Sequence, residues 1–402
     1  MATRKRDLRT GTPIWSVPAV RGPRHDRLHR DLRVDVLVVG AGISGALTAE
    51  ALADAGLQVA IVDRRGAAKG STAASTALVQ YEVDEPLTLL AKKIGSDKAI
   101  RAWRRSALAL GNLRARTREL GFDCGLEDRS SLYLSGDRLG REALRLEAEA
   151  RRAAGLETVF LNRRAVLDRF TIRREAALLS FGNMVADPRR MALGYLRAAT
   201  AAGATFFASV EITKVEARAR LVLAQTAQGP VIRCRSLVFA TGYEIPHLVP
   251  ASGHKIISTF ALATKPQTRR LWPERCLIWE ASDPYLYMRT TADGRVIAGG
   301  EDEEFADEAR RDALLPAKIA KIGRGMNRLF PELDMQAAFA WTGSFGTTAT
   351  GLPSIGEIPG QRNCWAILGF GGNGITYSRI ASEIIRAHFT GRADPDADLY
   401  AF

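Results

Sequence analysis

The run Gly40-Ala41-Gly42-Ile43-Ser44-Gly45 has the spacing of a dinucleotide-binding turn. Gly40 permits a tight turn, Gly42 lets the backbone approach a pyrophosphate, and Gly45 lets a helix pack against the preceding strand. The first N–H groups of that helix, at Ile43 and Ser44, would face the phosphates. The spacing therefore predicts a nucleotide site near the start of the chain.

A second set of residues extends this predicted site. Asp63 lies eighteen residues after Gly45, where a carboxylate can accept hydrogen bonds from a ribose, and Arg64 follows it. The segment 69–77 is rich in small and hydroxyl residues, which let backbone N–H groups approach a flat or anionic ligand. This favours FAD over NAD, whereas the alternative is a flexible linker. The cofactor contacts expected here are Ser71, Thr72, Ala74, Ser75, Thr76 and Ala77.

Gly369-Phe370-Gly371-Gly372-Asn373-Gly374 repeats the glycine spacing near the other end of the chain. Only 28 residues follow Gly374, too few for a second nucleotide unit with its own ribose-binding acid. We expect instead that the following helix begins at the flavin, where its dipole stabilises negative charge on the N1/C2=O edge. Electrons would then come from a bound organic substrate. The contacts expected here are Gly371, Gly372, Asn373, Gly374, Ile375 and Thr376.

The elements that must position these residues alternate between strands and helices. Strands at 34–39 and 58–63 flank a helix at 43–55, which makes a βαβ unit. A further strand at 236–242 ends in Ala240, Thr241 and Gly242, which we also assign to the cofactor. Helices are predicted over 86–120, 139–155, 192–202, 308–329 and 377–388, and strands near 205–216, 220–225 and 364–368.

The stretch 255–300 has a β-rich pattern and contains the candidate catalytic residues. Tyr285, Tyr287 and Arg289 alternate, so a strand would place them on one face, and Asp293-Gly294 predicts a hairpin turn after them. The alternative is that these side chains are simply sheet core. An acid of the run 301–303 could hold a cationic amine, although a solvated charge run has the same pattern.

The motifs 38–45, 70–77, 186–188, 240–242, 342–356 and 369–375 occur in an order that resembles the D-amino-acid oxidase/glycine oxidase/sarcosine oxidase family. The resemblance implies an α/β fold with a discontinuous Rossmann-type FAD domain and an α+β substrate domain on a mixed, largely antiparallel sheet. It also implies oxidation of a C–N bond of an amine or N-substituted amino acid, by hydride transfer to flavin, imine hydrolysis and reoxidation by O2 to H2O2. We expect 34–90, 180–250 and 340–402 to form the FAD domain and 91–179 and 251–339 the substrate domain.

Three departures from the family pattern refine this expectation. The arginine that amino-acid oxidases place after the glycine matching Gly343 is absent, since Ser344 and Phe345 follow. No cysteine stands in the segment where sarcosine oxidases tether the flavin, so we expect noncovalent FAD. Their oxygen-activating lysine has no counterpart at 296–298. The substrate is then an amine-bearing compound, with Arg289 as a possible displaced carboxylate anchor.

Composition narrows the remaining classes. The net charge is +13, and residues 1–33 form a basic extension that we interpret as a solvated tail. Four scattered cysteines and five histidines have no metal spacing, so we expect neither zinc nor disulfides. No apolar run approaches the ~20 residues needed to span a bilayer, and we find no secretory signal. This predicts a cytoplasmic enzyme without membrane or nucleic-acid partners. The alternatives are a dehydrogenase that passes electrons to a quinone or carrier protein, and a tRNA-associated flavoprotein.

Overall fold

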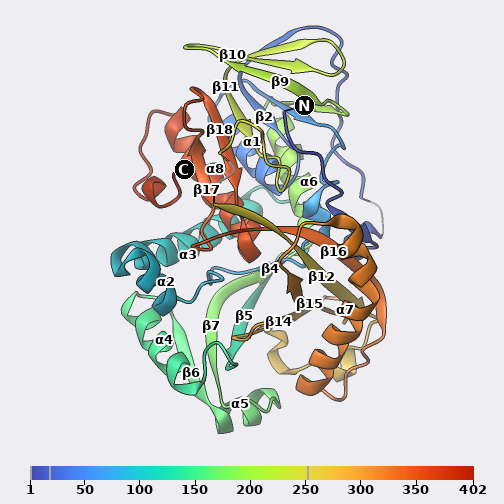
Figure 1. The fold of residues 1–402 in the computed structure, drawn as a ribbon, viewed down its shortest axis with the longest axis vertical. Coiled ribbons are helices and arrows are strands. Elements are labelled where there is room, and N and C mark those ends of the chain that lie inside the picture. Colours follow the sequence, from blue (N-terminus) through green and yellow to red (C-terminus); the bar gives the residue numbers. More distant parts are fainter. Residues whose placement is uncertain (1, 18–19, 251–252) are drawn as a thin grey trace.

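A computed structural model describes residues 2–17, 20–250 and 253–402. They form two sheets, one in the upper and one in the lower half of Figure 1, with helices packed on both. Each sheet contains parallel and antiparallel pairs, and the class is α/β as predicted.

The first sheet has the order β17-β18-β11-β2-β3-β8, and β10 and β9 extend it from β11. β2 is parallel to β3 and to β11, and β11 is parallel to β18. Its strands are β2 (Leu32–Val39), β3 (Val59–Asp63), β8 (Thr205–Ala208), β9 (Ile212–Ala217), β10 (Val222–Thr226), β11 (Val231–Phe239), β17 (Ser354–Glu357) and β18 (Cys364–Leu368).

The continuous apolar run of β2 follows from burial on both faces of this sheet. Val36 and Val38 pack in one core with helices α1, α3, α6 and α8. Leu37 and Val39 pack in another core with residues of β9 and β10. A strand between two cores needs apolar side chains at every position, which is why the run does not alternate.

The helices on the first face are α1 (Ile43–Asp54), α3 (Ser96–Glu119), α6 (Pro188–Ala201) and α8 (Gly374–Phe389). α1 lies against both α6 and α8, and its small residues allow that close contact. The single helix predicted over 86–120 is two helices, α2 (Leu87–Ile94) and α3. Gly95 separates them with φ of +88°, a conformation that suits glycine.

The second sheet has the order β1-β16-β12-β15-β14-β13-β5-β7-β4, with β6 beside β7. β13 and β5 are parallel and the other described pairs are antiparallel, as predicted for the substrate domain. Its strands are β1 (Arg9–Gly11), β4 (Leu78–Val79), β5 (Glu127–Leu134), β6 (Thr158–Asn162), β7 (Ala176–Val185), β12 (His254–Thr264), β13 (Leu277–Glu280), β14 (Leu286–Thr290), β15 (Val296–Glu303) and β16 (Ala337–Thr348).

Three helices accompany this sheet: α4 (Arg141–Ala153), α5 (Arg163–Phe170) and α7 (Glu308–Leu329). α7 lies along β12, β15 and β16, at the right of Figure 1. The predicted hairpin is β14 and β15, with Tyr287 opposite Gly299 and Arg289 opposite Ile297. Short 3-10 turns occur at Ile14–Ser16, Ser71–Ala74, Thr268–Arg270, Pro273–Arg275, Gly371–Asn373 and Ala397–Leu399.

The sequence segments that form each sheet differ in places from the segments expected for the two domains. β16 and β4 belong to the second sheet, although most of β16 and all of β4 fall in segments expected for the FAD domain. β7, which straddles the expected boundary at 180, is also a strand of the second sheet. α3 lies in the segment 91–179 expected for the substrate domain but packs in the core of the first sheet. The remaining strands of the expected segments fall in the corresponding sheets, and the division into two domains remains our interpretation.

The first residues of the chain do not form the solvated tail that their charge suggested. Leu8 is buried, β1 pairs antiparallel with β16, and Ala2 N donates to Ile212 O at 3.3 Å. Leu8 O accepts from Ser344 N at 2.9 Å. The segment therefore contacts both sheets, because its backbone groups find partners at two exposed strand edges. Among the residues that the structure describes, no helix combines the length and hydropathy needed to cross a bilayer.

Candidate active site

A cavity of about 250 Å³ joins the two sheets. The first sheet contributes the turn after β2, the end of β3 and the turn after β11, and the second contributes Trp279, Tyr285, Tyr287 and Phe345. Every residue that the sequence assigned to the cofactor lines this cavity, with the exception of Gly45. The two glycine motifs, more than 300 residues apart, therefore belong to one site.

The first glycine turn has the geometry that its sequence predicts. A Cβ on Gly40, which has φ of +116°, would lie 2.3 Å from Ala240 O. A Cβ on Gly45 would lie 1.8 Å from Gly40 O, so Gly45 acts through packing and does not reach the cavity. Gly42 caps α1 without a side-chain hydrogen bond, which leaves the positive end of the helix at the cavity.

Asp63 ends β3 and organises the loop beneath this turn. Its carboxylate accepts from Ala41 N at 2.8 Å, Arg65 N at 2.7 Å and Gly66 N at 2.8 Å. Burial raises the pKa of the Asp63 carboxyl, and the three backbone donors oppose that shift. The structure thus gives Asp63 a part in fixing the loop, and its contact with a ribose stays a prediction.

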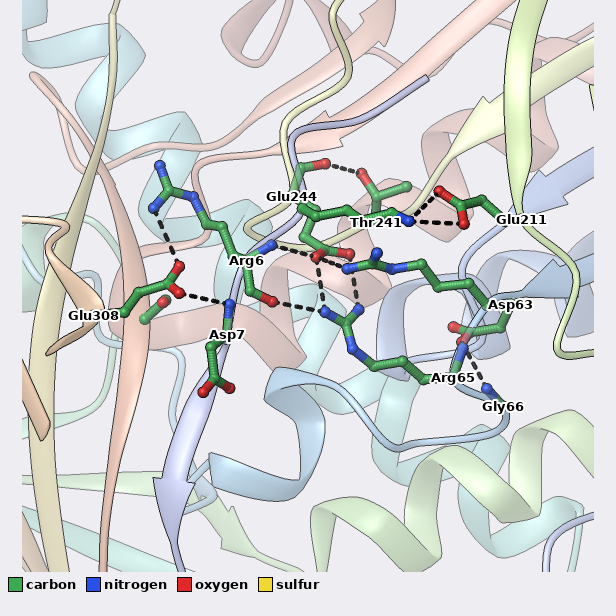
Figure 2. Close-up of polar contacts among 12 residues, drawn as sticks. Arg6, Asp7, Asp63, Arg65, Gly66, Glu211, Thr241, Glu244 and Glu308 are labelled. Atoms are coloured by element: carbon green, nitrogen blue, oxygen red, sulfur yellow. Dashed lines mark hydrogen bonds and ion pairs between the residues drawn. The ribbon is translucent and has the colours of Figure 1, made fainter. Parts of the chain in front are cut away.

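Glu244, which the sequence did not single out, pairs with Arg65, as Figure 2 shows, and also with Arg64. Arg65 donates to its two oxygens at 2.8 and 2.7 Å, and Arg64 forms an ion pair with the same carboxylate. Arg6 N donates to Glu244 at 2.9 Å. Burial alone would raise the pKa of Glu244, but these donors and charges hold it below its ordinary value. The N-terminal segment is thereby tied to the cofactor end of the cavity.

The loop Ser71–Ala77 is held by backbone contacts from distant elements. The indole of Trp15 donates to Ser75 O at 2.7 Å, and that of Trp341 donates to Ala74 O at 2.8 Å. Thr72 Oγ1 accepts from Ile43 N at 3.0 Å. Ser71 Oγ is buried without a hydrogen-bond partner among the described residues, as expected for a group that awaits a ligand.

The second glycine motif is bound to the segment 80–84. Asn373 Nδ2 donates to Glu82 O at 2.6 Å, and Thr376 Oγ1 donates to Gln80 O at 2.7 Å. Gly372 N donates to Asp84 Oδ2 at 2.6 Å. α8 begins here without a side-chain cap, so its N-terminus also lies at the cavity.

These features fit FAD. The N-terminus of α1 and the unpartnered Ser71 hydroxyl suit phosphates, although the Ile43 N–H that was expected to face them donates to Thr72. Gly42 leaves room for the close approach of the phosphates. The uncapped N-terminus of α8 suits the electron-rich edge of a flavin. All four cysteines are buried and free, and none of them lines the cavity.

Aromatic side chains line the end of the cavity contributed by the second sheet. Tyr285 and Tyr287 stack with ring centroids 5.8 Å apart, and Trp279 stacks on Tyr133 at 3.8 Å. Tyr285 donates to Asp302 Oδ2 at 2.9 Å. Burial, and then the charge of Asp302, raises the pKa of Tyr285 well above its ordinary value, so the phenol keeps its proton. Both tyrosines therefore face the cavity, as a substrate role requires.

Arg289 does not line the cavity. Its guanidinium donates to Ala77 O at 3.0 Å and to Ala186 O at 3.2 Å, and it lies 5.1 Å from the ring centre of Trp15. Burial lowers its pKa, and the nearby charge of Asp187 opposes that shift. The alternation pattern predicted the same face for Arg289 as for Tyr285 and Tyr287. The two tyrosines line the cavity, whereas Arg289 lies against the end of the loop 71–77.

Acidic groups gather near the aromatic end. Burial raises the pKa of Asp302 to about 6 and that of Asp84 to about 6. Glu301 and Glu303 instead pair with Lys318, at 3.3 and 2.6 Å. The run 301–303 is thus divided, since only Asp302 contacts a residue of the cavity wall. Asp84 could have been noticed in the sequence only as an acid shortly after the loop 69–77.

Comparison with known proteins shows the family of the chain. The sequence model of the FAD dependent oxidoreductase (DAO) family matches residues 35–387, and the chain therefore belongs to that family. It is an FAD-dependent oxidoreductase, which confirms the cofactor and the resemblance inferred from the motifs.

Individual relatives are distant. The chain is 24% identical over 392 residues to the gamma-glutamylputrescine oxidoreductase of Escherichia coli (strain K12), which covers 92% of this chain and 86% of that protein. The glycine oxidase of Geobacillus kaustophilus superposes with a TM-score of 0.73 at 18% identity, over 90% of this chain and 96% of that one. The L-proline dehydrogenase of P. horikoshii superposes with a TM-score of 0.76 at 17% identity, over 92% and 97%. These two structures share the fold.

Proposed function

We propose that this enzyme oxidises a C–N bond of an amine or amino acid and uses O2 as the electron acceptor. The observation that supports this best is the continuity of the cavity. It runs from the phosphate-binding turn past the N-terminus of α8 to the wall formed by Trp279, Tyr285 and Tyr287. A substrate against that wall would lie next to the cofactor, away from bulk water.

When bound, FAD would accept the two electrons of the C–H bond next to nitrogen. The aromatic wall would orient that bond, and the protonated Tyr285 phenol would hold a hydrogen bond to Asp302 throughout. The N-terminus of α8 would stabilise negative charge that develops beside it. Overall, an amine with O2 and water would yield a carbonyl compound, ammonia or the smaller amine, and H2O2.

The test is a screen of amines and amino acids with the purified FAD-loaded protein in air, followed by a peroxidase-coupled assay for H2O2. A parallel series without oxygen uses an artificial electron acceptor. Peroxide from at least one amine or amino acid supports the proposal. Turnover only with the artificial acceptor supports C–N oxidation but contradicts the role of O2, in favour of a dehydrogenase. No turnover in either series contradicts the proposal as a whole.

A further inference from the structure

Asp84 lies where the aromatic end of the cavity meets the second glycine motif. Its carboxylate lines the cavity and accepts the Gly372 N–H at 2.6 Å. A Cβ on Gly371 or Gly372 would approach this carboxylate to 2.5 or 2.6 Å. Asp84 therefore packs directly on the glycines at the start of α8, beside the part of the cofactor site where the substrate must bind.

Among the residues that the structure describes, no cationic side chain forms an ion pair with this carboxylate. The lining residues, all of which the structure describes, include two cationic ones, Arg64 and Arg65, and both pair with Glu244 at the other end. Arg138 is the positive group with the clearest influence on Asp84, and it donates to both oxygens of Glu85 at 2.9 and 2.8 Å. Asp302 adds further negative charge. The aromatic end therefore has an excess of negative charge, to which Glu82, another lining residue, also contributes. The Asp84 carboxylate remains available to a ligand because no ion pair occupies it among the described residues.

The aromatic rings of the cavity provide an independent reason to expect a cation, and the charge of Asp84 acts on two of them, Tyr243 and Tyr285. Trp279, Tyr285, Tyr287, Tyr243 and Phe345 line the same cavity. Aromatic faces attract ammonium groups, and the attraction is strongest where water is excluded. An anionic ligand here would meet the Asp84 charge without a compensating donor, which is costly in a buried site.

We propose that Asp84 binds a second ammonium group of the substrate, so that the preferred substrate is a diamine-type cation without a carboxylate at that end. This inference rests on the proposed oxidation of a C–N bond. One amine, in its neutral form, presents the C–H bond to be oxidised, and the other, as ammonium, pairs with Asp84. Because the pKa of Asp84 is about 6, its carboxylate is mostly ionised at neutral pH even before the cation binds.

The test measures binding of three molecules of similar length: 1,4-diaminobutane, 1-aminobutane and 4-aminobutanoate. Calorimetry with dithionite-reduced holoenzyme under argon keeps turnover out of the measurement. We expect the wild-type enzyme to bind 1,4-diaminobutane at least ~10-fold more tightly than 1-aminobutane, with 4-aminobutanoate weakest, since a charge-assisted contact contributes about that factor. Asp84→Asn should remove this preference and change the affinity for 1-aminobutane by less than about twofold.

Glu85→Gln is the matched control, because it removes the same charge one residue along the chain from a carboxylate that is already paired with Arg138 and Lys93. It should leave the preference for 1,4-diaminobutane intact. Equal binding of 1,4-diaminobutane and 4-aminobutanoate by the wild-type enzyme would overturn the inference without any variant. So would an Asp84→Asn protein that retains FAD and the full preference. If the binding pattern is as expected but no amine is oxidised, the proposed function fails and the cation site stands.

Discussion

The backbone N–H of Gly372 donates a 2.6 Å hydrogen bond to the carboxylate of Asp84, two residues 288 positions apart in the chain. This contact joins the segment after the first cofactor loop to the start of α8. It places a partly buried carboxylate beside the site of a flavin, and the free energy of folding must depend on the protonation state of that carboxylate.

We predict that Asp84→Asn stabilises the FAD-free protein above pH 6. Burial, and then the charges of Asp302 and Glu85, raises the pKa of Asp84 to about 6, against the Gly372 N–H and the charge of Arg138. A carboxyl group with a raised pKa in the folded state loses stabilisation as pH rises from about 4 through 6. The variant should gain up to ~3 kcal/mol in the free energy of unfolding at pH 8 and nothing at pH 4, measured by urea denaturation. Glu157→Gln, at an exposed position, is the control; a less stable Asp84→Asn protein at pH 8 would contradict the prediction.

Arg289→Met should weaken FAD binding by roughly 10-fold or more and act equally on all substrates. The guanidinium holds Ala77 O and Ala186 O, and its loss releases the end of the loop Ser71–Ala77. FAD affinity is measured by titrating apoprotein and following the quenching of flavin fluorescence. Arg295→Met makes the same change in the hairpin, away from the cavity, and should leave FAD affinity unchanged. A selective loss of activity with carboxylated substrates would instead restore the role of carboxylate anchor.

Asp63→Ala should raise the FAD dissociation constant and also lower stability. The ribose contact, if formed, adds a charge-assisted hydrogen bond worth ~1.5–3 kcal/mol, and the three backbone donors at Ala41, Arg65 and Gly66 lose their acceptor. Paired measurements of FAD affinity and of thermal unfolding without FAD separate the two effects. An unchanged dissociation constant would refute the ribose role.

Deletion of residues 1–12 should weaken FAD binding and destabilise the protein. Leu8 is buried, β1 completes the edge of the second sheet, and Arg6 N supports the Glu244 carboxylate. The deletion also lowers the positive charge, so the triple variant Arg24→Gln, Arg27→Gln, Arg30→Gln serves as a charge control at exposed positions. The prediction fails if the deletion and the triple variant have the same FAD affinity and melting temperature.

The flavin should be bound noncovalently. The four cysteines are buried and lie outside the cavity lining, so none is placed to tether the cofactor. Precipitation of the protein with acid should release the yellow chromophore into the supernatant. Flavin that stays with the washed pellet would be evidence for a covalent link.

The cofactor site could be predicted from the sequence because its requirements are local. Glycines at Gly40, Gly42 and Gly45 are needed where the backbone turns tightly or touches another segment, and such contacts leave a fixed spacing in the chain. The buried strand before them is apolar at every position for an equally local reason, since each face meets its own core. Family, fold class and cofactor followed from these patterns.

The substrate end depended on contacts between residues far apart in sequence. Alternation predicted one face for Tyr285, Tyr287 and Arg289, but only the two tyrosines line the cavity. Arg289 instead contacts the loop 71–77, through its hydrogen bond to Ala77 O. The same holds for Asp84, whose spacing from Gly372 signals nothing in the sequence. We expected the basic N-terminal segment to be a solvated tail because its charged side chains favour contact with water. Its place was decided by backbone N–H and C=O groups, which every sequence shares and only the tertiary structure pairs.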